Sequence, residues 1–272
     1  MKQVFTIDNN DEPHRERSVL SIRVGDRHAG FAITDLASGA LQQLAWYTGE
    51  EISPASLAGL FDQHEHFNNT YKRIQVCYDR PQSILIPTPA YREEDTRSML
   101  ETSYGITGYD MVFTDRILSW QMNNSYAVPK EIHQWVTDNF SRADIFHQYS
   151  VAIKNIEVAT EEAHFMLEFR PDDFSLIICK GADLVLAQSY LYTSPPDVIY
   201  YLLKACMAVG VTPENIRLSL SGMIDRQSIL YRELYQYFIA IEFKQPTWST
   251  VQGHVYPAHF FTSLNDLARC AS

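Results

Sequence analysis

The segment SIRVGDRHAGFAITD, residues 21–35, places Arg23, Gly25 and Asp26 around one tight turn. Apolar and polar residues alternate on both sides of this turn, which indicates two strands joined as a hairpin. An arginine can pair with phosphate through charge-assisted hydrogen bonds. A glycine lets backbone amides approach an anion more closely than a bulkier residue would. The chemistry that these residue types could support is phosphate binding.

A second hairpin pattern, HFMLEFRPDDFSLIIC, carries Glu168, Arg170, Asp172 and Asp173 around its turn. A glutamate is a competent oxygen ligand for a metal ion, and Arg170 could pair with phosphate. The two aspartates oppose that chemistry, because like charges repel a phosphate group. The sequence RPDD is also a favourable type I turn in its own right, with proline at its second position.

The elements that would position these turns form a weak internal repeat. Two blocks, beginning at Gly39 and Gly181, each run from Gly-Ala through an apolar strand to Tyr-Thr, and Pro54 or Pro196 then opens a helix. Both helices carry apolar residues in the i, i+3, i+4, i+7 pattern of one buried face, and a short strand follows each.

Each half therefore reads as three strands, a helix, a strand and a further helix. We expect the further helix at 91–105 in the first half and at 226–238 in the second, where the strand IAIEF follows it. The triplet NNS at 123–125 predicts a turn between strand-like runs, and a helix is expected to start near Pro129. The predicted fold is α/β, with two tandem βββαβα lobes at 1–150 and 151–272.

Composition narrows the classes of partner. The formal net charge is -11, which argues against general nucleic-acid binding because phosphate backbones would be repelled. The four cysteines are scattered and predict buried, reduced thiols without a metal site. No apolar run approaches the ~18 residues of a membrane span, and the amino terminus lacks a secretory signal pattern. We expect a cytoplasmic protein.

This order of elements resembles the actin-like ATPase superfamily, which includes actin, sugar kinases and Hsp70 and is built from ribonuclease H-like lobes. The stretch RIQVCYDRPQSILIPTPAYREEDTRSML, residues 73–100, is similar to type IV pilus assembly ATPase-like proteins and to cell-division actin homologues. The segment HFFTSLNDLARC, residues 259–270, lies where that group has its last helix. More narrowly, the chain resembles a bacterial family of unknown function with a degenerate form of this fold.

The resemblance implies an Asp-x-Gly turn in each lobe, whose aspartate helps to position metal and water. The first aspartate is replaced by Arg23, while Gly25 is kept. In the second turn, Glu168 stands at the aspartate position and Arg170 at the glycine position. Most of the phosphate-binding chemistry of the superfamily is therefore missing.

The resemblance also implies a Gly-Gly pair that packs on adenosine. Here Ser221 and Gly222 occupy that region, and the second glycine is Met223. The candidate ligand site between the lobes consists of the following residues: Arg23, Gly25, Asp26, Glu168, Arg170, Asp172, Asp173, Ser221 and Gly222.

The reading we favour is a scaffold or regulator without catalytic residues or cofactor, which binds another protein. One alternative is an ATP-binding kinase or ATPase that holds ATP with Mg²⁺ in a variant site, using Arg23, Glu168, Asp172 and Asp173. A further alternative is an unrelated α/β enzyme. For Arg23 alone, the plain alternative is an exposed strand residue beside the turn. The oligomeric state stays open.

Overall fold

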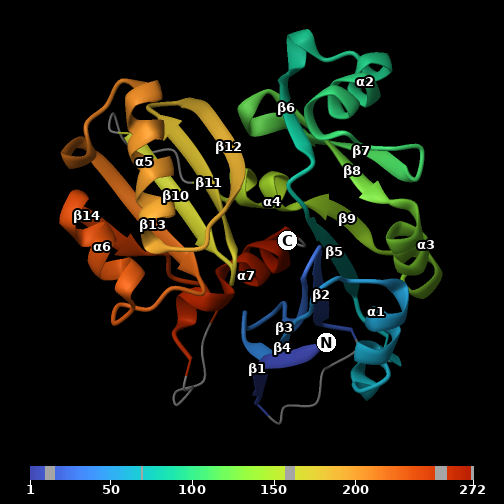
Figure 1. Ribbon diagram of the computed structural model, residues 1–272. Coiled ribbons are helices and arrows are strands. Elements are labelled where there is room, and N and C mark those ends of the chain that lie inside the picture. The colour runs from blue at the N-terminus through green and yellow to red at the C-terminus, as the bar shows by residue number, and fades with distance from the viewer. Residues whose placement is uncertain (10–15, 69, 157–162, 249–255, 271–272) are drawn as a thin grey trace. The chain divides into compact units, whose positions relative to one another are not determined.

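The computed structural model describes residues 1–9, 16–68, 70–156, 163–248 and 256–270 (Figure 1). The chain divides into two compact units. Unit 1 comprises Met1–Asn155, Thr247–His254 and Ser263–Ser272, and unit 2 comprises Ile156–Pro246 and Val255–Thr262. The carboxy-terminal segment therefore groups with unit 1, whereas the expected second lobe ran to the end of the chain. The lobe boundary at 150 and 151 stays a prediction.

Unit 1 is built around a sheet with antiparallel and parallel parts. Its strand order is β1 (Lys2–Asp8), β4 (Leu41–Thr48), β3 (His28–Asp35), β2 (Ser18–Gly25), β5 (Arg73–Asp79) and β9 (Asp144–His147). The first four strands pair antiparallel, and β5 and β9 continue from β2 in parallel. Every residue of β2 and β3 is buried, which is typical of central strands covered on both faces.

Besides α2 (Glu93–Tyr104), which is described below, the helices of unit 1 are α1 (Pro54–Phe61), α3 (Lys130–Asn139), α4 (Gln148–Lys154) and, for most of its length, α7 (Thr262–Arg269). Helix α1 starts with a capping box between Ser53 and Ser56 and has proline in its first turn, so its first amides have partners. Leu57 of α1 and Val136 of α3 belong to the apolar core on this sheet.

A small second sheet is inserted between β5 and α3. It has the order β6 (Ser83–Pro87), β8 (Met122–Pro129) and β7 (Asp110–Ile117), and α2 (Glu93–Tyr104) packs on it through Leu100. We call this part, β6 to β8 with α2, the inserted subdomain.

Two sequence predictions about this region were wrong. The helix expected at 91–105 is present as α2, but its predicted place as the second helix of the lobe was wrong, because it belongs to the inserted subdomain. The helix that precedes β9 on the main sheet is α3, which starts next to Pro129 as expected. The triplet NNS, residues 123–125, lies inside strand β8 and is buried, and the turn falls earlier, at Gln121 with φ 50°. Polar residues that are satisfied within a core resemble a turn when only the sequence is read.

Unit 2 repeats the topology of unit 1. Its strand order is β12 (Asp183–Leu191), β11 (Asp173–Lys180), β10 (Ala163–Phe169), β13 (Ile216–Gly222) and β14 (Ala240–Phe243), with helices α5 (Pro195–Val209) and α6 (Ile229–Tyr237). The first three strands are antiparallel, and β13 and β14 are parallel to β10. The same order and sense occur in β4, β3, β2, β5 and β9, so the predicted α/β fold with two βββαβα lobes is confirmed.

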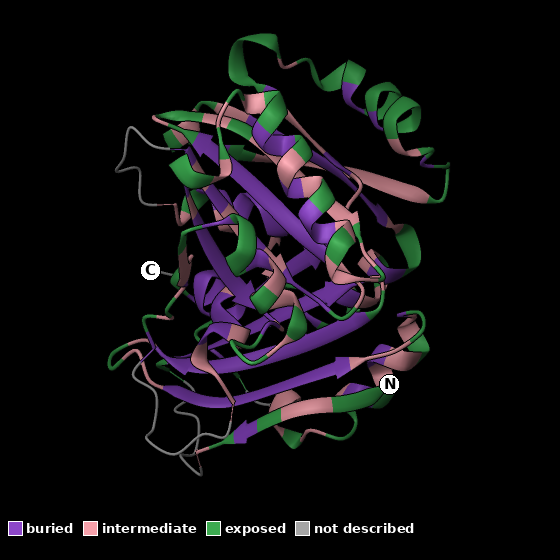
Figure 2. Cartoon of the chain, turned by 60° about the vertical axis from the view of Figure 1, so that its left-hand side comes forward, coloured by how far each residue is buried: buried purple, intermediate pink, exposed green. Residues whose placement is uncertain are grey.

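Each unit has its own apolar core. Figure 2 shows the buried residues concentrated along the strands, while the helices keep exposed residues on their outer faces. In unit 2, Phe165 and Leu218 from the sheet pack with Leu202 of α5 and Leu234 of α6. Short 3-10 helices lie at Glu65–Asn68, Thr88–Ala90, Leu118–Trp120, Pro213–Asn215 and Ala258–Phe261.

The structure also bears on the composition arguments. Cys77, Cys179 and Cys206 are free and buried, as predicted, and Cys270 is free and half-buried. Among the described residues, no helix combines the length and the apolar character that crossing a bilayer requires.

Candidate functional site

The register of the strands makes the two candidate turns comparable. The last residue of β2 that pairs with β3 is Val24, and the last residue of β10 that pairs with β11 is Phe169. Arg23 and Glu168 therefore occupy equivalent positions, one residue before the last pair of each hairpin. One residue after it stand Gly25 in unit 1 and Arg170 in unit 2, in agreement with the alignment made from sequence.

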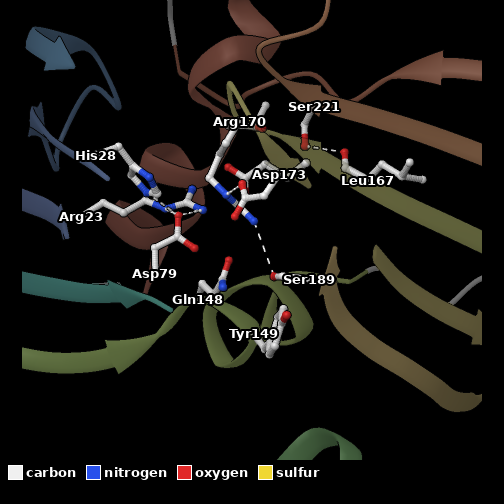
Figure 3. A network of polar contacts seen from close by, with 12 residues as sticks. Arg23, His28, Asp79, Gln148, Tyr149, Leu167, Arg170, Asp173, Ser189 and Ser221 are labelled. Carbon is white, nitrogen blue, oxygen red and sulfur yellow. Dashed lines mark hydrogen bonds and ion pairs between the residues drawn. The ribbon is translucent and has the colours of Figure 1, made fainter. Parts of the chain in front are cut away.

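In unit 1, the side chains of the first turn form a buried ion-pair cluster. The Arg23 Nε and Nη2 groups donate to one carboxylate oxygen of Asp79, at 2.8 and 2.6 Å. The same oxygen lies 2.6 Å from Nε2 of His28 (Figure 3). Arg23 is 1% exposed. The alternative of an exposed strand residue was therefore wrong, because Asp79 at the end of β5 supplies the charge that lets this arginine be buried.

The imidazole of His28 fills the space beside Gly25. A Cβ atom added at Gly25 would lie 2.3 to 2.8 Å from three atoms of that ring. The ring stacks on Trp46, with centroids 5.0 Å apart. The absence of a side chain at Gly25 thus makes room for a histidine of the same chain.

The remaining residue of the first turn, Asp26, forms an ion pair with Arg80, the residue after β5. The carbonyl oxygen of Arg80 in turn faces Nε2 of His147 at 2.9 Å and accepts from the Gln148 side chain at 3.2 Å. Arg80 therefore links the turn to the ends of the two parallel strands β5 and β9.

The second turn, in unit 2, also pairs its own charges. Nε of Arg170 lies 2.5 Å from the carboxylate of Asp173, and Nη1 lies 3.8 Å from that of Glu168. Its Nη2 faces the hydroxyl of Ser189 at 3.5 Å (Figure 3). Arg170 is 3% exposed, and these three contacts come from β10, β11 and β12 of the same sheet. Asp172 lies in the turn itself, where its carbonyl accepts from the Tyr192 amide at 3.0 Å.

The last two predicted residues lie on the neighbouring strand β13, where Ser221 pairs with Glu168 in the ladder. The Ser221 hydroxyl donates to the Leu167 carbonyl at 3.0 Å. Gly222 has φ +75°, and a Cβ there would lie 2.2 Å from the Phe169 carbonyl oxygen. A glycine at this position is therefore required by backbone packing inside the sheet.

Sequence reasoning missed a buried polar network in unit 1. The Asn124 side chain donates to Nδ1 of His147 at 3.0 Å and to the Ser150 hydroxyl at 2.9 Å, and it accepts from Ser83 at 2.5 Å. The carboxylate of Asp115 accepts from the His147 amide at 2.8 Å.

Burial acts on both titratable groups of this network. It lowers the pKa of His147 to about 4, against the opposing effect of its hydrogen bond to the Arg80 carbonyl. Because Nδ1 accepts from Asn124, Nε2 carries the proton of a neutral ring. Burial likewise raises the pKa of Asp115.

A sequence signal for the missed residues did exist, although it was weak. Asp79 and His147 end the parallel strands β5 and β9. Side chains at the carboxyl ends of parallel strands gather at one edge of a sheet. Identifying these residues requires the knowledge that β9 pairs with β5. The prediction did not include this pairing, because it placed the helix at 91–105 in the lobe in the position that α3 occupies.

Taken together, the arrangement within each unit is one of charges neutralised by near neighbours. Unit 1 joins Arg23, Asp79 and His28, and unit 2 joins Arg170, Asp173 and Glu168. Among the described residues, no group of three or more histidine, cysteine, aspartate or glutamate side chains could hold a metal ion.

Two βββαβα lobes of equivalent topology define a protein of actin-like ATPase fold. The chain belongs to the family described as "Protein of unknown function (DUF3822)", which matches residues 7–241. No curated protein gives a significant match.

Solved structures share the fold. A Bacteroides thetaiotaomicron protein with actin-like ATPase fold and unknown function is 18% identical, with TM-score 0.79 over 94% of this chain and 97% of that one. The PilM–PilN type IV pilus biogenesis complex gives 13% identity and TM-score 0.59 over 94% and 98%. The ethanolamine utilization protein EutJ from Carboxydothermus hydrogenoformans gives 7% identity and TM-score 0.53 over 94% and 91%. The alternative of an unrelated α/β enzyme is thereby excluded at the level of the fold.

Proposed function

We propose that this protein is a non-catalytic member of the actin-like fold that works by binding another protein, in the cytoplasm and without a nucleotide cofactor. The observation that carries the proposal is the filling of both phosphate turns by side chains of the same chain. In the first turn, the ring of His28 lies against Gly25 and Arg23 is bound to Asp79. In the second, Arg170 stands where the resemblance expects a glycine.

Energetics support this proposal. A nucleotide that recruited Arg23 would have to draw it away from Asp79, and breaking a buried ion pair costs about 3–5 kcal/mol. Glu168 and Asp173 face the same difficulty, because both lie beside the buried Arg170. The alternative site for ATP and Mg²⁺, formed by Arg23, Glu168, Asp172 and Asp173, would begin from groups that already have partners.

The proposal of a protein partner is also supported by one structural relative. PilM shares this fold and has been solved in a complex with PilN. That complex is an example of an actin-like fold serving in an assembly. At 13% identity the likeness concerns the fold, so the partner of the present chain has to be argued from its own surface.

The test is the melting temperature of the purified protein with Mg²⁺ and ATP, ADP or AMP. A ligand at 100 times its dissociation constant stabilises a protein by about 2.7 kcal/mol, which a melting curve resolves. We expect no shift at millimolar nucleotide. A shift that Glu168→Gln reduces, while Glu101→Gln on the exposed face of α2 leaves it intact, would support the variant nucleotide site instead.

A further inference from the structure

The inserted subdomain contains a polar pocket of about 470 Å³ between α2 and β7. Its lining residues are Tyr91, Glu93, Thr96, Arg97, Val112, Thr114 and Arg116. The residues from β7 alternate along the strand and so share one face of the small sheet. The volume falls within the range of about 300–1,000 Å³ that is usual for ligand sites.

The composition of α2 explains why this space is open. Leu100 and Tyr104, in the second half of the helix, pack on the sheet with Ala127. The first half, EEDTRSM, has Met99 as its apolar residue, and Met99 is 42% exposed. The buried residue of this half is the polar Thr96, so the first turns of α2 place no buried apolar side chain against the sheet.

The charges of the pocket favour an anion that carries a single charge. Arg116 is exposed, and the described residues provide no hydrogen bond or ion pair to its side chain, although its backbone belongs to the β7–β8 ladder. Arg97, which also lines the pocket, donates to the carbonyl of Asp110 at 2.9 Å and lies 3.6 Å from the Glu101 carboxylate, so it is fixed in place and already has a countercharge. A guanidinium group binds a carboxylate through two parallel hydrogen bonds. Glu93 on the wall adds repulsion that a doubly charged phosphate would feel more strongly than a carboxylate.

Hydroxyl groups connect two of the lining residues. Tyr91 donates to Thr114 at 3.3 Å, and the Thr114 hydroxyl lies 2.8 Å from that of Ser125. This chain fixes Tyr91 at the pocket, and tyrosine is enriched among residues that contribute most to protein interfaces.

Exposed apolar residues border the pocket strand at both ends. Tyr109 precedes β7 and is 84% exposed, and Leu118 follows it and is 83% exposed. Large apolar side chains next to a charged pocket suit a protein segment, which can cover them, better than a small metabolite.

We propose that this pocket binds the carboxylate of an aspartate or glutamate on a partner protein, with apolar residues of the partner covering Tyr109 and Leu118. This inference rests on the proposed protein-binding function and names the chemistry of the partner. Arg116 supplies the charge, and the fixed Arg97 and Tyr91 shape the pocket.

The experiment is an NMR titration of the full chain with a blocked peptide, acetyl-Leu-Glu-Leu-Tyr-amide. We expect saturable shifts of the amides at 91–97 and 112–116, with a dissociation constant of about 1 mM or tighter. Arg116→Gln should weaken binding roughly tenfold or more, the value of a charged hydrogen bond. Arg92→Gln removes an exposed arginine of the same subdomain that does not line the pocket, and should leave binding unchanged.

Three results would overturn the inference: absence of saturable shifts, equal binding of the peptide with glutamine in place of glutamate, or equal loss in the two arginine variants. Tighter binding of glutarate or inorganic phosphate than of the peptide would also overturn it, because the ligand would then be a small molecule. Nucleotide binding in the melting experiment would overturn the proposed function while leaving this titration readable, so the two failures are distinguishable.

Discussion

At the scale of single residues, the first turn shows a charged side chain, Arg23, that is paired inside its own sheet. Arg23 stands at a position where the resemblance expects an aspartate, and its guanidinium is directed to Asp79 within the same sheet. His28 completes the cluster. The residue identities were readable from sequence, but the partner was not, because Asp79 lies 56 positions away on β5.

Replacement of Asp79 should therefore be costly. Asp79→Asn leaves the Arg23 guanidinium buried without a countercharge, and we expect a loss of about 3–5 kcal/mol in the free energy of unfolding. Glu101→Gln removes the exposed partner of Arg97 on α2 and should cost no more than about 0.5 kcal/mol. Urea denaturation of both variants measures the difference, and equal losses would show that the buried cluster adds nothing to stability.

His147 predicts a specific dependence of stability on pH. Its folded-state pKa of about 4 lies below the ordinary 6.5, so between these values the unfolded chain binds a proton that the folded chain does not. Its contribution to stability is complete above pH 6.5 and is lost as the pH falls through 4. The loss in the free energy of unfolding amounts to about 3 kcal/mol once the pH is below 4.

His147 is the N-cap residue of α4, where its side chain accepts from the Tyr149 amide at 3.2 Å. The matched comparison is His147→Asn, because asparagine can also cap a helix. This variant should be less stable at pH 7, because the Arg80 carbonyl loses the His147 ring as a donor and keeps the Gln148 side chain. It should nevertheless lose less further stability between pH 6.5 and pH 4.5 than the parent protein. Parallel pH profiles of unfolding free energy in the two proteins would contradict the assignment of a buried neutral histidine.

At the scale of elements, the sequence allowed the repeated strand order and the paired turns to be predicted, because alternation, proline and glycine leave local signals. The second helix of the first lobe could not be placed. The true helix, α3, and the inserted α2 carry similar patterns, and the choice between them depends on the long-range pairing of β9 with β5. Likewise, the polar NNS triplet is inside β8 because Ser83, His147 and Ser150 satisfy Asn124.

Two glycines with positive φ allow the effect of backbone conformation on stability to be compared with the effect of close packing. Gly181 has φ +59° with open space around it, and Gly222 has φ +75° with the Phe169 carbonyl oxygen in the path of a Cβ. Gly181→Ala should lower the free energy of unfolding by about 1–2 kcal/mol, because alanine is strained in a left-handed conformation. Gly222→Ala should cost clearly more, because the obstructing atom is backbone. Thermal unfolding measures both, and equal costs would show that the sheet yields at this point.

At the scale of the whole molecule, the two units share a topology, which is what duplication of one ancestral lobe predicts, and each has adapted its turn separately. Unit 1 buries an arginine with an aspartate from β5, and unit 2 buries one with carboxylates from its own hairpin. A shared fold thus leaves the site free to change, since function depends on the residues placed on the fold. The inserted subdomain supplies a polar pocket of its own.

The most direct test of the central claim is an isothermal titration of the purified protein with Mg²⁺ and ATP. We expect no saturable heat at nucleotide concentrations up to the millimolar range, because both turns are filled by side chains that already have partners. A one-to-one isotherm with a dissociation constant of about 100 μM or tighter, weakened by Glu168→Gln, would contradict it.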